Sequence, residues 1–364
     1  MKTALSEKTG DFFGGKIMKK FIAMLMALVM VCALCACGES AAPAASAPAA
    51  QAPAAEAPAA AAPAASSVSA DLTVGTGGES GTYYAFTGVV GTVVGQKSDI
   101  KLNVVSTGGS KANLLGIQEG MYDLATVQSD VMTYAYQGSN SFAESGAITD
   151  FRVLCAMYPE TVQMVTCNPD IKSVEDLKGK SVCVGDVGSG TYYNTIDVFA
   201  AYGMTLDDVK VQYQSFQDSA DSLQDGSIDA AFLCAGAPTT AVSQLAASKP
   251  VYMISIDDEH MEKLLADCPW YAKIVLPAGT YEGYDEETST VTVKATLVCS
   301  ESTPDDVAYA IVKTIFDNTD EITALHAKGE YLGLEFATDG IAVPFAKGAA
   351  QFFAENGITV ATAD

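Results

Sequence analysis

One tetrapeptide, Gly-Thr-Tyr-Tyr, occurs twice in this chain, each time where an apolar run ends and a helical pattern begins. The two copies are residues 81–84 and 190–193. Glycines between a strand and a helix let the backbone approach a ligand closely, and the first turn of the helix offers unpaired N–H groups. The repeat therefore favours folds in which strands lead directly into helices, and it predicts a ligand beside these junctions.

Short runs of β-branched residues alternate with helical patterns through most of the chain. The runs predicted to be strands are residues 72–74, 101–105, 124–127, 153–157, 181–184, 209–213, 230–233 and 251–254. The helical patterns between them include residues 82–94, 111–118, 191–201 and 237–247. This order predicts an α/β fold with mainly parallel sheets and helices on both faces, where ligands bind at the carboxyl ends of strands.

The N-terminal residues 1–37 have the layout of an export signal. A lysine pair at 19 and 20 precedes fourteen uncharged residues, too few for a membrane span of about 20 residues. The run ends in Leu-Cys-Ala-Cys-Gly, which resembles the lipobox of bacterial lipoproteins and would place a lipid on Cys37. An ordinary cleaved signal peptide is the alternative. Residues 1–17 fit no signal pattern, so we expect translation to begin at Met18.

Residues 41–65 consist of Ala and Pro apart from three positions, with a proline at every fifth residue from 43 to 63. Prolines at that interval block helix formation. Residues 38–70 are therefore predicted to be a disordered tether that holds a globule, residues 71–364, away from a membrane. We expect the globule to lie outside the cytoplasm, lipid-anchored at the outer face of the cell membrane or in the periplasm.

Composition removes several classes of function. The 44 acidic residues outnumber the 20 basic ones, whereas nucleic-acid binders need a basic surface. The six cysteines of the globule form no C-x-x-C pair and only two histidines are present, His260 and His326, so no metal site is expected. Both histidines are predicted to lie on surface helices. Buried free thiols are the favoured interpretation of the cysteines in the globule, with two or three disulfides as the alternative: Cys155, Cys167, Cys183, Cys234, Cys268 and Cys299.

Enzyme and nucleotide motifs are also missing from the sequence. Neither glycine loop contains the Gly-Lys-Ser/Thr of a Walker loop, and no acidic residue ends the second predicted strand as a dinucleotide fold requires. There is no Gly-x-Ser-x-Gly of a serine hydrolase. We therefore expect no catalytic residues and no cofactor.

A third glycine loop, residues 107–113, has the same composition as the two repeats. In this acid-rich chain residues 82–98 and 110–118 contain no Asp or Glu, although the first turn of a helix usually carries one to balance its dipole. The uncompensated helix ends predict an anionic ligand. Ordinary turn and capping chemistry is the alternative.

Several motifs follow one another in a fixed order along the globule. They occupy residues 75–84, 109–113, 120–130, 154–160, 171–180, 185–191 and 226–238. Together they resemble the TAXI-type solute receptors of TRAP transporters over residues 72 to about 247. Beyond that point the resemblance is looser.

The resemblance implies the type II periplasmic-binding-protein fold, with two α/β lobes and a solute in the cleft between them. We expect lobe 1 to comprise residues 71–159 plus 290–364 and lobe 2 to comprise residues 160–289, with chain crossings near 158–163 and 279–292. The implied partners are the sodium-driven TRAP membrane subunits, and we expect a monomeric receptor rather than an enzyme. Glutamate, glutamine or a related C5 dicarboxylate are the solutes that the family suggests.

Roles follow for individual residues. Backbone N–H groups of the glycine loops would bind a carboxylate, and the rings of Tyr83 and Tyr192 would line the pocket around the solute. Glu160 would accept a hydrogen bond from an amino group of the solute or stabilise the hinge. The predicted ligand-binding residues are Gly77, Gly78, Thr82, Tyr83, Ser110, Asn113, Gln128, Tyr158, Glu160, Gly188, Ser189, Gly190, Thr191, Tyr192 and Pro238. Arg152, the only arginine, is expected at the surface. An ABC-type receptor or sensor input, an exported enzyme and a ligand-free adhesin are the alternatives.

Overall fold

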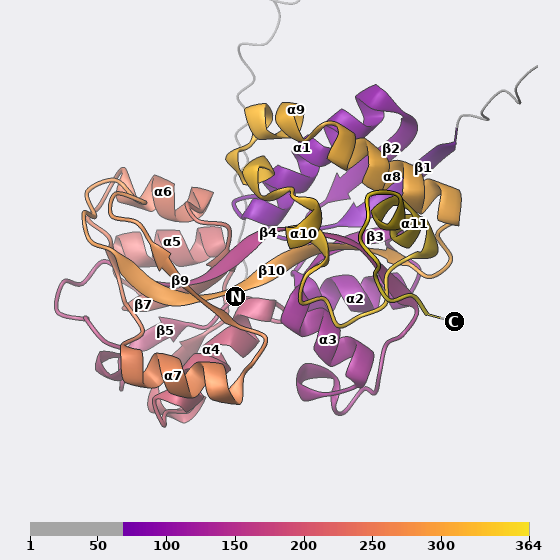
Figure 1. The fold of residues 1–364 in the computed structure, drawn as a ribbon. Coiled ribbons are helices and arrows are strands. Elements are labelled where there is room, and N and C mark those ends of the chain that lie inside the picture. The colour runs from indigo at the N-terminus through magenta and orange to yellow at the C-terminus, as the bar shows by residue number, and fades with distance from the viewer. Residues whose placement is uncertain (1–67, 364) are drawn as a thin grey trace, which may run out of the picture. The chain divides into compact units, whose positions relative to one another are not determined.

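Two long strands, β4 (Phe151–Thr166) and β10 (Thr288–Ser300), pair antiparallel along most of their length. They belong to the computed structural model of the protein, which describes residues 68–363. Figure 1 shows both strands running from one group of helices to the other. The chain therefore passes twice between two lobes, and these strands are the connections.

Lobe 1 is built on β1 (Ser69–Gly75), β2 (Asp99–Val105) and β3 (Leu124–Gln128). β1 pairs in parallel with both of its neighbours, and β3 pairs antiparallel with β10. Its helices are α1 (Thr82–Lys97), α2 (Ser110–Gln118), α3 (Ser129–Gln137), α8 (Asp305–Asp317), α9 (Thr319–Leu325), α10 (Leu334–Thr338) and α11 (Lys347–Glu355). One hydrophobic core joins residues 74–158 to residues 295–353, so the C-terminal helices return to this lobe.

Lobe 2 is built on β5 (Ser181–Cys183), β6 (Lys210–Gln212) and β7 (Ala230–Ala235), with β5 parallel to both neighbours. The short strands β8 (Tyr252–Met253) and β9 (Ala272–Leu276) pair antiparallel with β4 and β10. Its helices are α4 (Gly190–Ala201), α5 (Phe216–Asp225), α6 (Thr240–Ala246) and α7 (Asp258–Asp267). Two hydrophobic cores, both within residues 162–293, fill this lobe.

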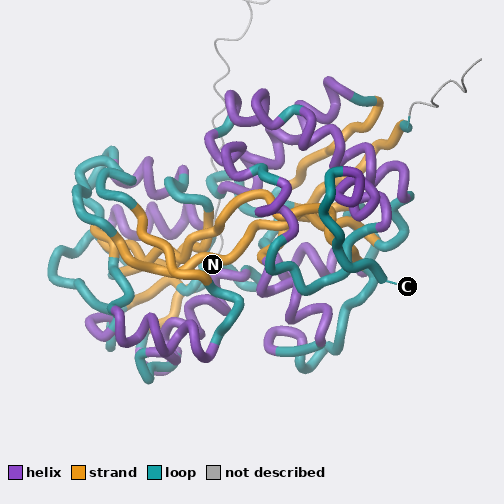
Figure 2. Tube along the Cα trace, viewed as in Figure 1, coloured by secondary structure: helices purple, strands orange, loops and turns teal. Residues whose placement is uncertain are grey.

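Both lobes share one sheet of order β2-β1-β3-β10-β4-β7-β5-β6, with helices on either side of it (Figure 2). The predicted type II fold with two crossings is confirmed. The sheet is mixed, because every pair that β4 or β10 forms is antiparallel while the parallel pairs are confined to the lobes.

The helices that follow the two Gly-Thr-Tyr-Tyr loops, α1 and α4, bury residues at the same spacing. α1 buries Tyr83, Phe86, Val90 and Val94, and α4 repeats the pattern from Thr191 onward. Side chains three and four apart share one face of a helix, so each helix lays this face on its sheet. The first glycine loop follows β1 and the second follows β5, so both loops stand at the carboxyl end of a strand.

Some predicted boundaries differ in the structure. The sequence pattern predicts neither β9 nor β10. The helix predicted over 237–247 begins at Thr240, since Thr239 is its N-cap and Pro238 lies in the preceding loop. The predicted signal, Met18 start, Cys37 lipidation and most of the tether fall in residues 1–67, outside the described residues. Within 68–363 no helix is long and apolar enough to cross a membrane.

Candidate functional site

The N-termini of three helices meet at one pocket between the lobes: α1 and α2 from lobe 1, and α4 from lobe 2. The pocket encloses about 550 Å³ of empty space, its open mouth included. It is lined by Gly77, Gly78, Gly81, Thr82, Tyr83, Thr107, Gly108, Gly109, Ser110, Gln128, Glu160, Asp186, Ser189, Gly190, Thr191, Ser215, Phe216, Cys234 and Ala235. All three glycine loops singled out in the sequence thus contribute to one site.

These helix ends are poorly capped. The N-caps of α1 and α2 are Gly81 and Gly109, and neither provides a side-chain cap. Ser189, the N-cap of α4, accepts only a long 3.4 Å hydrogen bond from the Tyr192 N–H. No acidic residue stands in the first turn of any of the three helices. Free N–H groups and the positive ends of three helix dipoles therefore favour an anion in the pocket.

The two lobes touch directly around the pocket. The Lys111 N–H donates to the Gly188 carbonyl at 3.1 Å, joining the second and third glycine loops. Thr82 Oγ1 donates to the Gly236 carbonyl at 3.0 Å, and Lys328 Nζ donates to the Ala237 carbonyl at 2.6 Å. Because each bond joins residues of different lobes, the structure represents a closed cleft.

Glu160 lies on the pocket wall and is 1% exposed. Its Oε2 is buried and has no hydrogen-bond partner within residues 68–363. Burial raises the pKa of Glu160 well above its usual value, although Tyr83 and Lys328 favour the ionised form. An unsatisfied buried carboxylate oxygen is costly, so a donor on a ligand would stabilise it.

The charged side chains that line the pocket are all acidic. Glu160 and Asp186 are present, and no Lys, Arg or His is among the lining residues. Any anionic group of a ligand must therefore be held by N–H and hydroxyl groups. A cationic group of the ligand is favoured beside Glu160.

Ten of the residues predicted from the sequence line the pocket: Gly77, Gly78, Thr82, Tyr83, Ser110, Gln128, Glu160, Ser189, Gly190 and Thr191. Five do not: Asn113, Tyr158, Gly188, Tyr192 and Pro238.

The five other residues have structural surroundings that explain their positions. The Asn113 amide is occupied by the Thr76 and Thr126 carbonyls and by Thr107 Oγ1, so it holds the loops together from behind. Tyr158 is buried against Phe86.

Gly188 offers its carbonyl to Lys111, as described above. The Tyr192 ring contacts Tyr193 and Tyr213 outside the pocket, and Pro238 is exposed.

Sequence reasoning missed the far wall of the pocket. Phe216 and its neighbour Ser215, from the start of α5, line it together with Cys234 and Ala235 at the end of β7. The Phe216 ring lies 3.4 Å from where a β-carbon on Gly81 would stand, so it closes the site from lobe 2. No local motif marks these positions, because only the packing of α5 brings them to the pocket.

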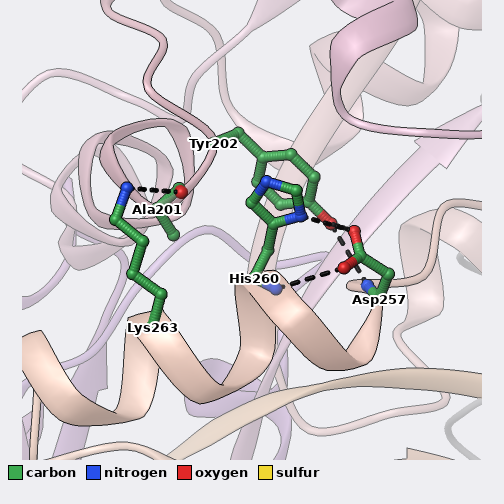
Figure 3. Close-up of polar contacts among 5 residues, drawn as sticks. All are labelled: Ala201, Tyr202, Asp257, His260 and Lys263. Atoms are coloured by element: carbon green, nitrogen blue, oxygen red, sulfur yellow. Dashed lines mark hydrogen bonds and ion pairs between the residues drawn. The ribbon is translucent and has the colours of Figure 1, made fainter.

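Arg152, His260 and His326 lie away from the pocket. Arg152 pairs with Glu301 outside the pocket, but its side chain is only 13% exposed, so it is more covered than the expected surface position implies. His260 lies in the first turn of α7, where its ring stacks on Tyr202 and contacts Asp257, the N-cap of the helix (Figure 3). The prediction of a surface-helix position is wrong for His326, which is half-buried just after α9, with its ring against Phe86.

The six cysteines of the described chain are free, and all except Cys167 are buried, as the favoured interpretation predicts. Between residues 68 and 363 no group of three or more His, Cys, Asp or Glu is placed to hold a metal ion.

Comparisons with known proteins give one family and several distant structures. Residues 74–357 match the model of a family described as NMT1-like. The alkanesulfonate-binding protein from Xanthomonas axonopodis pv. citri bound to MOPS is 15% identical, with a TM-score of 0.46, over 78% of this chain and 83% of that one. An ancestral arginine-binding protein bound to arginine is 16% identical, with a TM-score of 0.46, over 72% and 98%.

Proposed function

The chain belongs to the NMT1-like family, and we propose that it is an extracytoplasmic solute-binding receptor that captures a small carboxylate between its lobes. The observation that carries this proposal is the convergence of three poorly capped helix N-termini, from both lobes, on one pocket. A closed cleft of this kind surrounds a ligand with N–H donors. A micromolar dissociation constant needs about 8 kcal/mol, which several such hydrogen bonds and the excluded water together supply.

Within this class we propose an amino acid as the solute. Its carboxylate would lie at the helix ends and its ammonium group against Glu160, whose Oε2 lacks a partner among the described residues. The absence of a cationic side chain from the lining favours glutamine or glutamate over a C5 dicarboxylate without an amino group. A dicarboxylate without an amino group would bring two negative charges beside Glu160 and Asp186 and no positive one, whereas glutamine and glutamate carry an ammonium group that pairs with Glu160.

The resemblance to TAXI-type receptors supplies the rest of the proposal. The receptor would be held at the outer face of the cell membrane through a lipid on Cys37 and would deliver its solute to sodium-coupled TRAP membrane subunits. Transport in reconstituted vesicles that needs a sodium gradient and no ATP would support TRAP subunits over an ABC-type partner.

A thermal-shift screen of the purified protein against amino acids and dicarboxylic acids tests the binding function. A ligand at about a hundred times its dissociation constant adds about 2.7 kcal/mol of stability, so glutamine or glutamate should raise Tm clearly. Thr191→Ala should remove the shift, and Tyr192→Ala, a neighbour outside the pocket, should retain it. No shift with any solute would contradict the proposal.

An enzyme would use the same cleft differently. Mass spectrometry after incubation with the stabilising solute separates the two functions, because a receptor returns its solute unchanged and an enzyme does not.

A further inference from the structure

Behind the pocket, a ring of polar side chains joins the two lobes. Gln128 Nε2, from lobe 1, donates to Asp130 Oδ1 at 3.3 Å and to Asn194 Oδ1, from lobe 2, at 2.9 Å. Asn194 Nδ2 donates in turn to Asp130 Oδ2 at 3.1 Å and to the Tyr271 hydroxyl at 2.7 Å. The Tyr271 hydroxyl donates to Asp197 Oδ2 at 3.0 Å. Both side-chain N–H donors of Gln128 and both of Asn194 therefore have an acceptor. Gln128 is also part of the pocket wall.

Asp130 is the centre of this ring and is fully buried, at 0% exposure. No ion pair involving Asp130 is present in the described part of the chain. A buried carboxylate without a cation is costly when ionised and much less so when protonated.

The titratable groups that face Asp130 come from all the elements around it. They are Asp197 of α4, Tyr134 of its own helix, Tyr271 before β9, Cys268 after α7, Cys234 of β7 and Glu160 of β4. All of these groups are neutral or negative, so a charge on Asp130 is stabilised only by hydrogen bonds from amide N–H groups, and burial outweighs them.

We propose that Asp130 is a positioning residue that holds Gln128 in the pocket wall and fastens the closed lobes, and that it fastens them most firmly when it carries a proton. This inference rests on the proposed function, since it assumes that the lobes open and close. Opening withdraws Asn194 and Tyr271, both of lobe 2, and admits water to Asp130.

The direction of the pH effect follows from this change of surroundings. Burial raises the pKa of Asp130 to about 7 in the closed cleft, whereas an aspartate in water has a pKa of about 3.9. Closing therefore takes up a proton between these values. Asp130 alone should lower the ratio of closed to open protein by at most about tenfold per pH unit as the pH rises toward 7. Its contribution should level off above that value.

The chain contains its own reporter of closure. Trp270, the only tryptophan, comes from lobe 2 and packs edge-on against Tyr134 of lobe 1, with ring centroids 5.2 Å apart. Opening should expose this ring to water and move its fluorescence to longer wavelength.

The test is the Trp270 emission maximum of the full-length protein between pH 5 and 8.5, without solute and with 10 mM L-glutamine, whose charge is constant in this range. The wild type should shift to longer wavelength with rising pH. Asp130→Asn should make the pH dependence shallower, leaving the part that Glu160 and Asp197 contribute through their own raised pKa values, and Asp197→Asn should move the midpoint to lower pH because it removes a neighbouring charge. Glu160→Gln should leave the part of the pH dependence that Asp130 contributes.

A pH-independent emission in the wild type, or a profile unchanged in both aspartate variants, would overturn the inference. If Asp130→Asn does not fold, the midpoint in Asp197→Asn decides. The two proposals fail separately: a protein with the predicted profile that binds no solute contradicts only the proposed function. A solute binder with flat emission in both conditions contradicts only the role of Asp130.

Discussion

Gly190, the first residue of α4, lies against the side chain of Gln128 in the opposite lobe. A β-carbon at position 190 would stand 2.0 Å from Gln128 Oε1. The Gln128 side chain cannot swing away freely, because hydrogen bonds to Asp130 and Asn194 hold it. The closed cleft therefore requires glycine at this helix end, and the second Gly-Thr-Tyr-Tyr repeat has a steric role as well as an electrostatic one.

Gly190→Ala should separate closure from stability. Overpacking of this contact costs about 1–3 kcal/mol in the closed form, which lowers solute affinity by roughly 5–150-fold. The open form should gain slightly, since Ala is a better helix former than Gly by about 1 kcal/mol. Calorimetric titration with an amino acid should show the weaker binding, while the Tm without solute does not fall.

Gly88→Ala is the matched control for this substitution. Gly88 lies within α1, and a β-carbon there meets nothing within 4 Å. Its affinity should equal that of the wild type. Unchanged affinity in Gly190→Ala would contradict the steric argument.

Glu160→Gln should weaken amino acids selectively. A charged hydrogen bond contributes about 1.5–3 kcal/mol, so the loss is roughly 10–150-fold in dissociation constant. The hydroxy-acid analogue of the same solute lacks the ammonium group and should lose much less. Titration of both ligands against both proteins measures the difference, with the exposed Glu79→Gln as control. Equal losses for the two ligands would mean that Glu160 does not contact an ammonium group.

Lys328→Met should speed the release of solute. The Lys328 Nζ bond to the Ala237 carbonyl joins the lobes, and methionine retains the apolar stem without the donor. Loss of this bond destabilises only the closed form, by about 1–2 kcal/mol, so the dissociation rate should rise roughly 5–30-fold. Stopped-flow measurements test this expectation. Lys347→Met, on the exposed start of α11, should have no effect, and a wild-type release rate in Lys328→Met would exclude a role for the bond in closure.

Asp257 should support the folded state through the N-terminus of α7. Its carboxylate accepts from the His260 N–H at 3.1 Å and from the Tyr202 hydroxyl at 2.8 Å (Figure 3). Burial alone would raise the pKa of Asp257, but these hydrogen bonds and the His260 ring lower it to about 2.

Asp257→Ala should therefore lower the free energy of unfolding by about 1 kcal/mol at neutral pH. Because the pKa is depressed in the folded state, the contribution is present above about pH 4 and disappears as the pH falls toward 2. Denaturant unfolding at pH 7 and pH 3 measures it. The exposed Glu262→Ala, on the same helix, is the control, and an equal effect in both variants would argue against the cap.

The sequence predicts the helices and loops of this site better than its sheet. The bounds of α1, α2 and α4 follow from glycine loops and buried residues three and four apart, which are local signals. β10 was not predicted, because residues 288–300 become a strand by pairing with β3, β4 and β9, which are distant in the chain.

The same limit applies to the pocket. Loop glycines and the residues beside them line it, as their position at helix ends predicts. The Asn113 side chain does not line the pocket, because its Nδ2 donates to two backbone carbonyls that only the folded loops bring together. Phe216 reaches the pocket because α5 packs on α6 and β7 of its own lobe, contacts that no motif encodes.

A crystal structure of the protein with bound glutamine or glutamate is the most direct test of the central claim. We expect the solute carboxylate at the N-termini of α1, α2 and α4, and its ammonium group within hydrogen-bond distance of Glu160. A solute bound elsewhere, or oriented with its carboxylate toward Glu160, would contradict the account.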